Sequence, residues 1–154
     1  MKHADASAHG RENALKGELA GEILRGFGTL RLQVTGQSMI PSVWPGDILL
    51  IHRCAFTEIL SGDIVLYARE GRLFAHRVIC AAEDFENPRL VTQGDALPAP
   101  DPPVSAEELL GKVLQIFRVG KCGEPATVLT LKKKLAAHAA AHSTLAARLL
   151  VRMH

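Results

Sequence analysis

A serine, a histidine and two aspartates are the residues of this sequence whose types and order could support nucleophilic chemistry. Ser38 stands in the segment Gly-Gln-Ser-Met-Ile-Pro (36–41), where a glycine and a proline bound a turn after an alternating apolar–polar run. His76 lies in a predicted strand, and Asp95 and Asp101 follow in a Gly-Asp pair and the proline-rich loop after it. A serine on such a turn can project its hydroxyl away from a sheet, beside backbone N–H groups that can stabilise an oxyanion.

These residue types complement one another chemically. Serine is a poor nucleophile near neutral pH and needs a base within hydrogen-bond reach. Histidine suits that task because its ordinary pKa lies near 6.5, and a buried carboxylate can hold its tautomer and stabilise the imidazolium. Taken singly, each residue also has a structural interpretation, since a histidine on an apolar strand face is most often a hydrogen-bonded core residue. The hypothesis of a catalytic site therefore requires that the three segments meet in space.

Four short motifs in this sequence resemble those of signal peptidase I, in the order in which that family carries them. Each motif alone is weak, but four in the correct order make chance agreement improbable. They are Gly-x-Ser-Met-x-Pro-x-x-x-x-Gly-Asp (36–47), Gly-Asp-Ile-Val (62–65) with His-Arg-Val-Ile (76–79), Gln-Gly-Asp (93–95) with Asp101, and Gly-Lys-Val (111–113). The resemblance covers residues 29–119 and implies a serine endopeptidase without a cofactor or a metal.

The residue at the base position selects a branch of that family. Most bacterial signal peptidases have lysine there, whereas His76 is similar to the archaeal, endoplasmic-reticulum and sporulation-associated enzymes. The resemblance implies that Ser38 is the nucleophile and His76 the general base. The role of the orienting acid falls on Asp101 or Asp95, with Asp101 favoured and Asp95 expected to be structural or supporting.

The resemblance also implies where the substrate binds. Many family members have a serine two residues before the nucleophile, but this chain has Gly36. The oxyanion hole is therefore expected to use backbone N–H groups of Gln37 and Ser38. The expected substrate is a peptide or protein, such as a propeptide or leader, cut after small residues. The residues expected to contact it follow the serine: Met39, Ile40 and Pro41.

Two other functions fit parts of the same pattern. The Gly-x-Ser-Met turn is also similar to the self-cleaving domain of LexA-type repressors, and the Ala20–Gly21 bond would be a candidate cleavage site. That family uses a lysine base, however, and this sequence has His76. Alternatively, the protein is a catalytically silent module that binds extended peptides. That alternative rests on Ala96-Leu97, which stand where the histidine branch has two asparagines.

The elements that must position these residues are mostly strands. Short runs with alternating or buried apolar character, bounded by Gly, Pro and Asp, predict a mainly β fold, an antiparallel β-sandwich or barrel-like core. The predicted strands are 29–34, 48–51, 64–67, 73–79, 90–92 and 113–117, with a hairpin turn at Glu70-Gly71. Gly46-Asp47 and Gly62-Asp63 are expected to be turns that each lead into a strand.

Helices are predicted at both ends. We expect a disordered tail over residues 1–12, then a short amphipathic helix over 13–27, so that 1–28 form one unit before the catalytic domain at 29–119. The apolar stripe of this helix comprises Leu15, Leu19, Ile23 and Phe27. Ser105 and Glu108 resemble a helix start. Residues 120–154 are expected to form a linker and a basic, Ala-rich amphipathic C-terminal helix, which could contact a membrane surface or a partner protein.

Composition excludes several other classes. With 47% hydrophobic residues, the chain has enough apolar surface to fold. A net charge of +2 and only 5% aromatic residues argue against nucleic acid as a partner. There is no transmembrane-length apolar run and no secretory signal, so a cytoplasmic location is expected, at most peripheral to a membrane. The three cysteines, Cys54, Cys80 and Cys122, are expected to be reduced and buried.

Overall fold

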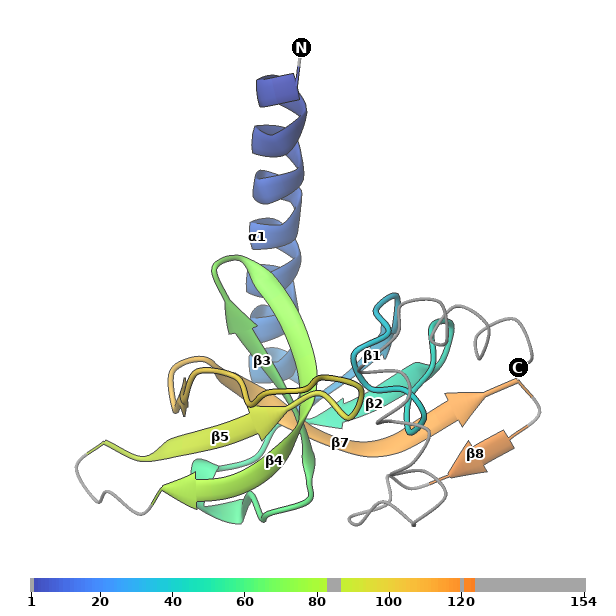
Figure 1. Ribbon diagram of the computed structural model, residues 1–154, viewed down its shortest axis with the longest axis vertical. Helices are drawn as coiled ribbons and strands as arrows, with labels where there is room; N and C mark the ends of the chain where they lie inside the picture. The colour runs from blue at the N-terminus through green and yellow to red at the C-terminus, as the bar shows by residue number, and fades with distance from the viewer. Residues whose placement is uncertain (1, 83–86, 120, 124–154) are drawn as a thin grey trace.

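The computed structural model describes residues 2–82, 87–119 and 121–123 of the chain. Its described part is one antiparallel sheet with a long helix standing against it (Figure 1), which confirms the mainly β prediction. The strands are β1 (Thr29–Gln33), β2 (Ile48–His52), β3 (Ile64–Arg69), β4 (Arg72–Ala82), β5 (Arg89–Gln93), β6 (Val104–Ser105), β7 (Leu109–Arg118) and β8 (Lys121–Gly123). A single 3-10 turn, η1 (Phe56–Glu58), lies between β2 and β3.

The strand order places β7 in the interior of the sheet, between β2 and β3. The order is β1-β2-β7-β3-β4-β5-β6, and β8 also pairs with β7. The hairpin β1–β2 and the meander β3–β4–β5 are therefore neighbours in the sheet only through β7, which lies between β2 and β3. The sheet extends past the predicted domain boundary at residue 119, because β8 continues it.

One stretch of β4 has an open edge. Strand β3 pairs with β4 from Arg72 to Arg77, whereas β5 begins to pair with β4 only at Arg77. Among the described strands, none pairs with the second edge of β4 before Arg77. Such an edge exposes backbone N–H and C=O groups that can pair with another extended chain.

The β3–β4 hairpin separates two apolar clusters. One cluster contains Leu24 of the helix together with Met39, Leu49, Leu66 and Val113. The other lies on the opposite face and contains Ile59, Val65, Tyr67, Val78, Leu90 and Val104. Residues of β3 and β4 alternate between these clusters, as expected for strands buried on both faces.

The helix α1 (Lys2–Phe27) is longer than predicted. The prediction of disorder over residues 1–12 is wrong for 2–12, a segment rich in alanine and charged residues that favour helices. The helix ends at Gly28, whose φ of 73° and N–H bond to the Leu24 carbonyl form a left-handed cap. Figure 1 shows α1 beside the β3–β4 hairpin, with its N-terminal part extending beyond the sheet.

The face that α1 buries consists mainly of small residues. Gly17, Ala20, Gly21 and Leu24 are buried, whereas most of the predicted apolar stripe faces solvent. Its members Leu15, Leu19 and Phe27 are 64%, 56% and 81% exposed. The reason is close contact, because a Cβ on Gly71 at the hairpin tip would lie 3.0 Å from Ala14. A helix backbone that approaches a hairpin this closely needs small side chains at the contact.

Other predictions are corrected or lie outside the described residues. Ser105 and Glu108 make both contacts of a capping box, yet the chain enters β7 instead of a helix. Glu108 is held by Arg69, as described below, so its carboxylate serves a tertiary contact. Cys80 and Cys122 are free and exposed, not buried. The predicted C-terminal helix over 128–154 lies outside the described residues. No helix in the described ranges combines the length and apolar character needed to cross a bilayer.

Candidate active site

The turn that carries Ser38 is closed on itself by backbone hydrogen bonds. Val34 and Asp47 lie at its two ends, where the Val34 N–H donates to the Asp47 carbonyl over 2.8 Å. The Asp47 carboxylate accepts a bond from the Trp44 N–H and is paired with Arg118 at 2.6 Å. Met39 and Val43 anchor the turn in the first apolar cluster. The turn is therefore fixed at its two ends by hydrogen bonds and in the core by Met39 and Val43. Ser38 lies next to these anchored residues.

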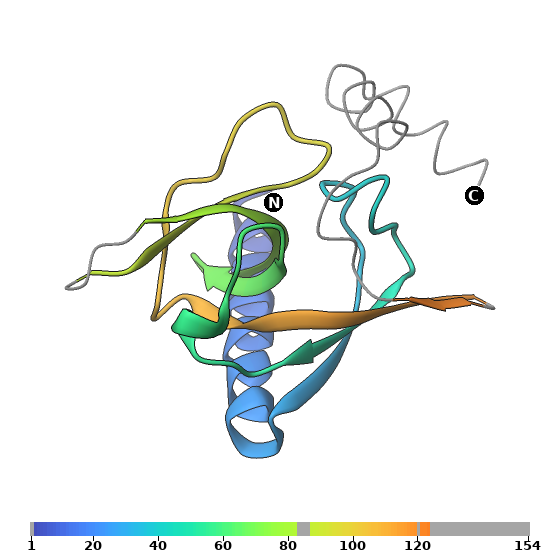
Figure 2. The same ribbon diagram turned by 90° about the horizontal axis from the view of Figure 1, so that it is seen from below.

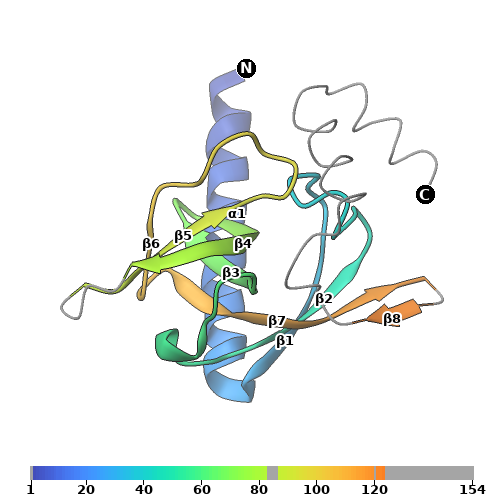
Figure 3. The same ribbon diagram turned by 60° about the horizontal axis from the view of Figure 1, so that its bottom comes forward.

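The loop after β5 packs directly on this turn. The Ala96 N–H donates to the Ser38 carbonyl over 2.8 Å, and a Cβ on Gly94 would lie 2.6 Å from the same oxygen. Figures 2 and 3 show this loop reaching across to the turn that follows β1. Gly94 thus allows two segments far apart in the sequence to touch backbone to backbone.

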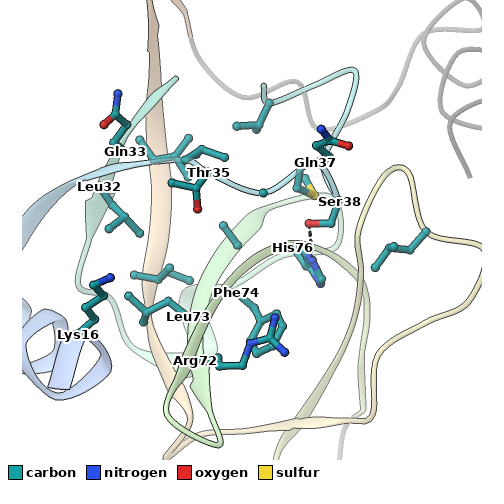
Figure 4. Close-up of a pocket in the computed structure, with 18 residues that line it drawn as sticks. Lys16, Leu32, Gln33, Thr35, Gln37, Ser38, Arg72, Leu73, Phe74 and His76 are labelled. Carbon is teal, nitrogen blue, oxygen red and sulfur yellow. Dashed lines mark hydrogen bonds between the residues drawn. The ribbon is translucent and has the colours of Figure 1, made fainter. Parts of the chain in front are cut away.

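Ser38, His76 and Asp101 lie in a hydrogen-bonded chain. The Oγ of Ser38 is 2.9 Å from Nε2 of His76, and Nδ1 of His76 is 2.7 Å from Oδ2 of Asp101. Figure 4 shows the serine hydroxyl directed at the imidazole of His76. His76 is 3% exposed, so its ring is almost completely shielded from water. This order of groups is that of a nucleophile, a general base and an orienting carboxylate.

Aromatic side chains and Thr92 hold the histidine and its aspartate in place. The ring of Tyr67 stacks on Phe74 at 5.3 Å, and both rings present edges to His76 at 6.1 and 5.9 Å. The Thr92 hydroxyl donates to Oδ2 of Asp101 over 2.7 Å. Burial, reinforced by the Asp101 carboxylate, raises the pKa of Tyr67 to about 12, so its hydroxyl stays neutral in ordinary buffers.

The second predicted aspartate, Asp95, makes a different contact. Both of its carboxylate oxygens accept bonds from Arg77, at 2.8 and 2.9 Å. The same guanidinium donates to the Gly62 carbonyl and to the Ser42 hydroxyl. Arg77 therefore connects the loop after β5, the turn before β3 and the turn of Ser38. The Asp95 carboxylate is therefore bonded to Arg77, whereas the carboxylate bonded to the His76 ring is that of Asp101.

A second arginine holds the far end of the same loop. Arg69 donates to the carbonyls of Pro102 and Pro103 and is paired with Glu108 at 2.6 Å. This guanidinium lowers the pKa of Glu108 to about 2. The loop that carries Asp101 is thus fastened near its start by Arg77 and just beyond Asp101 by Arg69.

Only some of the residues predicted to form the oxyanion hole or to contact substrate line the cleft. Gln37 and Ser38 line the cleft, and among the described residues no backbone carbonyl accepts a bond from the Ser38 N–H. Met39 also lines the cleft, although it is mostly buried. The expectation that Ile40 contacts substrate is corrected, because its side chain is 0% exposed in the interior. Pro41 lies outside the cleft lining, and its carbonyl accepts a bond from the Trp44 indole.

A cleft of about 670 Å³ leads away from the Ser38–His76 pair. It runs along the open edge of β4 between that strand and the segment that follows β1 (Figure 4). Its walls are mostly apolar and include Leu32, Val34, Leu73 and Phe74. Within the described ranges, no three His, Cys, Asp or Glu side chains gather in a way that could hold a metal ion.

The family of the protein follows from a match over most of this region. The family model described as peptidase S24-like matches residues 11–101, which include the C-terminal part of α1, the turn of Ser38, His76 and Asp101. The chain belongs to the peptidase S24-like family, a family of LexA-like and signal-peptidase-like serine peptidases. No curated protein matches the chain.

The sequence did not predict several residues that shape the site. Arg77 stands inside the His-Arg-Val-Ile motif and Thr92 directly before Gln-Gly-Asp, but their partners are distant in sequence and no local signal identifies them. Lys16, Arg72 and Phe74 line the cleft because of how the helix and hairpin pack. The alternation of Arg72, Phe74 and His76 on one strand face was the available signal for two of them.

Proposed function

We propose that the protein is a serine endopeptidase of the signal-peptidase type, acting on a peptide or protein substrate in trans. The observation that carries this proposal is the chain of contacts from Ser38 Oγ through the His76 ring to Asp101 Oδ2, at 2.9 and 2.7 Å. Membership of a serine-peptidase family supports the same chemistry.

In this proposal, Ser38 and His76 carry out acyl transfer. The Ser38 oxygen attacks the scissile carbonyl carbon while its proton passes to Nε2 of His76. The backbone N–H groups of Ser38 and Gln37 stabilise the oxyanion. Collapse of this intermediate breaks the C–N bond, and the imidazolium gives its proton to the leaving amine. A water molecule, deprotonated by His76, then hydrolyses the acyl-enzyme and regenerates the serine.

Asp101 orients the imidazole in this scheme. Its Oδ2 accepts a hydrogen bond from a protonated Nδ1, which leaves Nε2 free to accept the serine proton. Thr92 holds the same oxygen through its hydroxyl. Asp95 has a supporting role, since its carboxylate is taken by Arg77.

The open edge of β4 supports an extended peptide as substrate. A peptide in the cleft can add a strand beside residues 72–76, where β5 does not pair. Its alternate side chains would then face the two sides of the cleft. The preference for small residues before the cut rests on the resemblance to signal peptidases.

Cleavage of Ala20–Gly21 in the same chain is the less favoured function. Both residues lie within α1 on its buried face, with Ala20 4% exposed. A peptidase binds its substrate extended, so this bond would have to leave the helix and its packing first. A substrate in trans needs no such unfolding.

The proposal is tested with Ser38→Ala. Purified protein is incubated with a peptide library that carries alanine or glycine at each position, and the products are identified by mass spectrometry. Cleavage by the wild type and its loss by at least about 10³-fold in the variant are expected. Ser61→Ala is the matched control, because Ser61 is exposed outside the cleft and donates to the Ile79 carbonyl.

The result separates the candidate functions. Equal cleavage by the wild type and Ser38→Ala would overturn the proposal. Binding of peptides by the wild type without cleavage would favour the silent module. A shortened chain that begins at Gly21, formed at a rate independent of protein concentration, would favour self-cleavage.

A further inference from the structure

The end of the cleft away from the Ser38–His76 pair carries positive charge. Lys16 of α1 and Arg72 of β4 line it, and the set of 18 lining residues contains no aspartate or glutamate. Figure 4 shows the two cations on either side of Leu73, with the serine and histidine at the other end. Because the cleft has two cations at one end and no acidic side chain in its lining, its charge is polarised along its length. Such a charge distribution would orient a substrate that carries a negative charge, but not an uncharged one.

Packing of the helix on the hairpin places these cations. A Cβ on Gly71 would lie 3.0 Å from Ala14, and one on Gly17 would lie 3.8 Å from Ala68. These close approaches bring the turn of α1 that carries Lys16 to the tip of the hairpin, where β4 begins at Arg72. The guanidinium of Arg72 lies 5.4 Å from the ring of Phe74, which supports it beside the cleft.

Both cations remain available to a ligand. Among the described residues, no acidic side chain forms an ion pair with Arg72. Lys16 is paired with Glu12 at 2.7 Å, but both side chains are 58% exposed. An exposed pair of this kind contributes little, so a carboxylate in the cleft can share or replace Glu12.

The spacing along β4 sets where a ligand carboxylate would lie. Arg72, Phe74 and His76 share one face of the strand. Arg72 is four residues from His76, or about 13 Å at the usual rise per residue. An extended peptide paired with this edge has the same rise, so its residue opposite Arg72 is about four positions from the bond at Ser38.

We infer that Lys16 and Arg72 form a binding site for a carboxylate of the substrate, about four residues from the scissile bond. The inference rests on the proposed function and names the substrate class of the same site, a peptide with an acidic residue at that distance. A free C-terminal carboxylate at the same distance has the same chemistry.

Cleavage of a peptide set tests this site. Each peptide carries glutamate, alanine or lysine at one position from six residues before to six residues after the cut. Glutamate at a single position about four residues away is expected to raise kcat/KM about 3- to 10-fold over alanine, mainly through KM. The double variant Lys16→Ala/Arg72→Ala should lose this preference, and Arg72→Glu should favour lysine. Peptides that end at this position, with free or amidated termini, distinguish the two sources of the carboxylate.

Matched variants control for general charge effects. Arg25→Ala removes a helix cation whose pair with Glu22 resembles that of Lys16, and Arg89→Ala removes an exposed strand arginine. Neither lines the cleft, so both should keep the preference for glutamate. The same preference in Lys16→Ala/Arg72→Ala as in the wild type would overturn the inference, as would the absence of any position at which glutamate helps.

Binding to the Ser38→Ala variant separates this inference from the proposed function. Fluorescence anisotropy with labelled acidic and basic peptides is measured for this variant with and without Arg72→Ala. If the wild type cuts acidic and neutral peptides equally, the carboxylate site is wrong and the peptidase proposal stands. If nothing is cut but acidic peptides bind in an Arg72-dependent way, the site stands and the proposed reaction is wrong.

Discussion

Two neighbouring residues of β4 each bind an aspartate of the same loop, but the two pairs differ in kind. His76 contacts Asp101 through one ring nitrogen at 2.7 Å, and its other nitrogen reaches Ser38. Arg77 donates two hydrogen bonds to Asp95 and also donates to Gly62 and Ser42 in two other turns. Because adjacent residues of a strand face opposite sides, one loop serves both contacts on the two faces of β4.

The difference concerns protonation. Arginine stays charged at all ordinary pH values, so the Arg77–Asp95 pair is fixed once formed. Histidine can gain and lose a proton near neutral pH, and its pair leaves one nitrogen free for the serine. Asp95 has a side-chain exposure of 3% and Asp101 of 15%. The first pair is therefore suited to holding the loop and the second to moving a proton.

The largest effect is expected from Asp101→Asn. If Asp101 orients His76, this change should lower kcat by about 10²- to 10⁴-fold, because an amide can hold the wrong tautomer. The free energy of unfolding should change by no more than about 1 kcal/mol. Peptide cleavage and urea denaturation measure the two quantities. An unchanged kcat would show that Asp101 does not orient the base.

Asp95→Asn is expected to do the reverse. It leaves the buried charge of Arg77 without its anionic partner and should lower the free energy of unfolding by about 3 kcal/mol. The folded fraction should keep most of its kcat, measured below the unfolding midpoint. Equal losses of activity and stability in the two aspartate variants would erase the distinction between the pairs.

Acid should weaken the ion pair between Arg69 and Glu108, which holds the far end of the loop that carries Asp101. The pKa of Glu108 is about 2 in the folded protein because of Arg69, and near 4.3 in an unfolded chain. The pair therefore stabilises the fold above pH 4.3, and this contribution is lost as the pH falls toward 2. The full shift corresponds to about 3 kcal/mol, and solvent screening of this partly exposed pair reduces the expected loss of unfolding free energy to about 1 to 2 kcal/mol. Glu108→Gln should be less stable at pH 7 and less sensitive to acid, which urea denaturation at each pH would show.

The smallest effect is expected from Thr92→Val. The valine keeps the shape but removes the hydroxyl that donates to Asp101, a loss of about 1 kcal/mol. We expect kcat to fall about 3- to 10-fold with little change in KM, and Thr92→Ser to restore it. A change confined to stability would mean that Thr92 only packs against its neighbours.

The sequence identified the side chains that meet at the candidate site better than the side chains that position them. Ser38, His76 and Asp101 stand in ordered motifs, and the structure brings all three together. The contacts of Arg77 and Thr92 depend on how distant segments cross, which no local pattern records. Ile40 shows the same limit, since a residue beside a nucleophile can face either the cleft or the core.

The helix α1 shows why periodicity alone misled. Large apolar residues at Leu15, Leu19 and Phe27 predicted the buried face, but the hairpin approaches α1 on its side of small residues. Close backbone contact requires glycine and alanine, and these small residues do not contribute to a pattern of large apolar side chains. The same contact brings Lys16 to the cleft.

The position of β7 between β2 and β3 has a consequence for the order of events during synthesis. Ser38, His76 and Asp101 all precede β7 in the chain, but within the sheet the β1–β2 pair, whose connection carries Ser38, joins the meander that carries His76 only through β7. All three residues therefore leave the ribosome before the strand that joins their parts of the sheet. If they form a catalytic site, we expect the nascent chain to cut peptides only after residues 109–118 have completed the sheet.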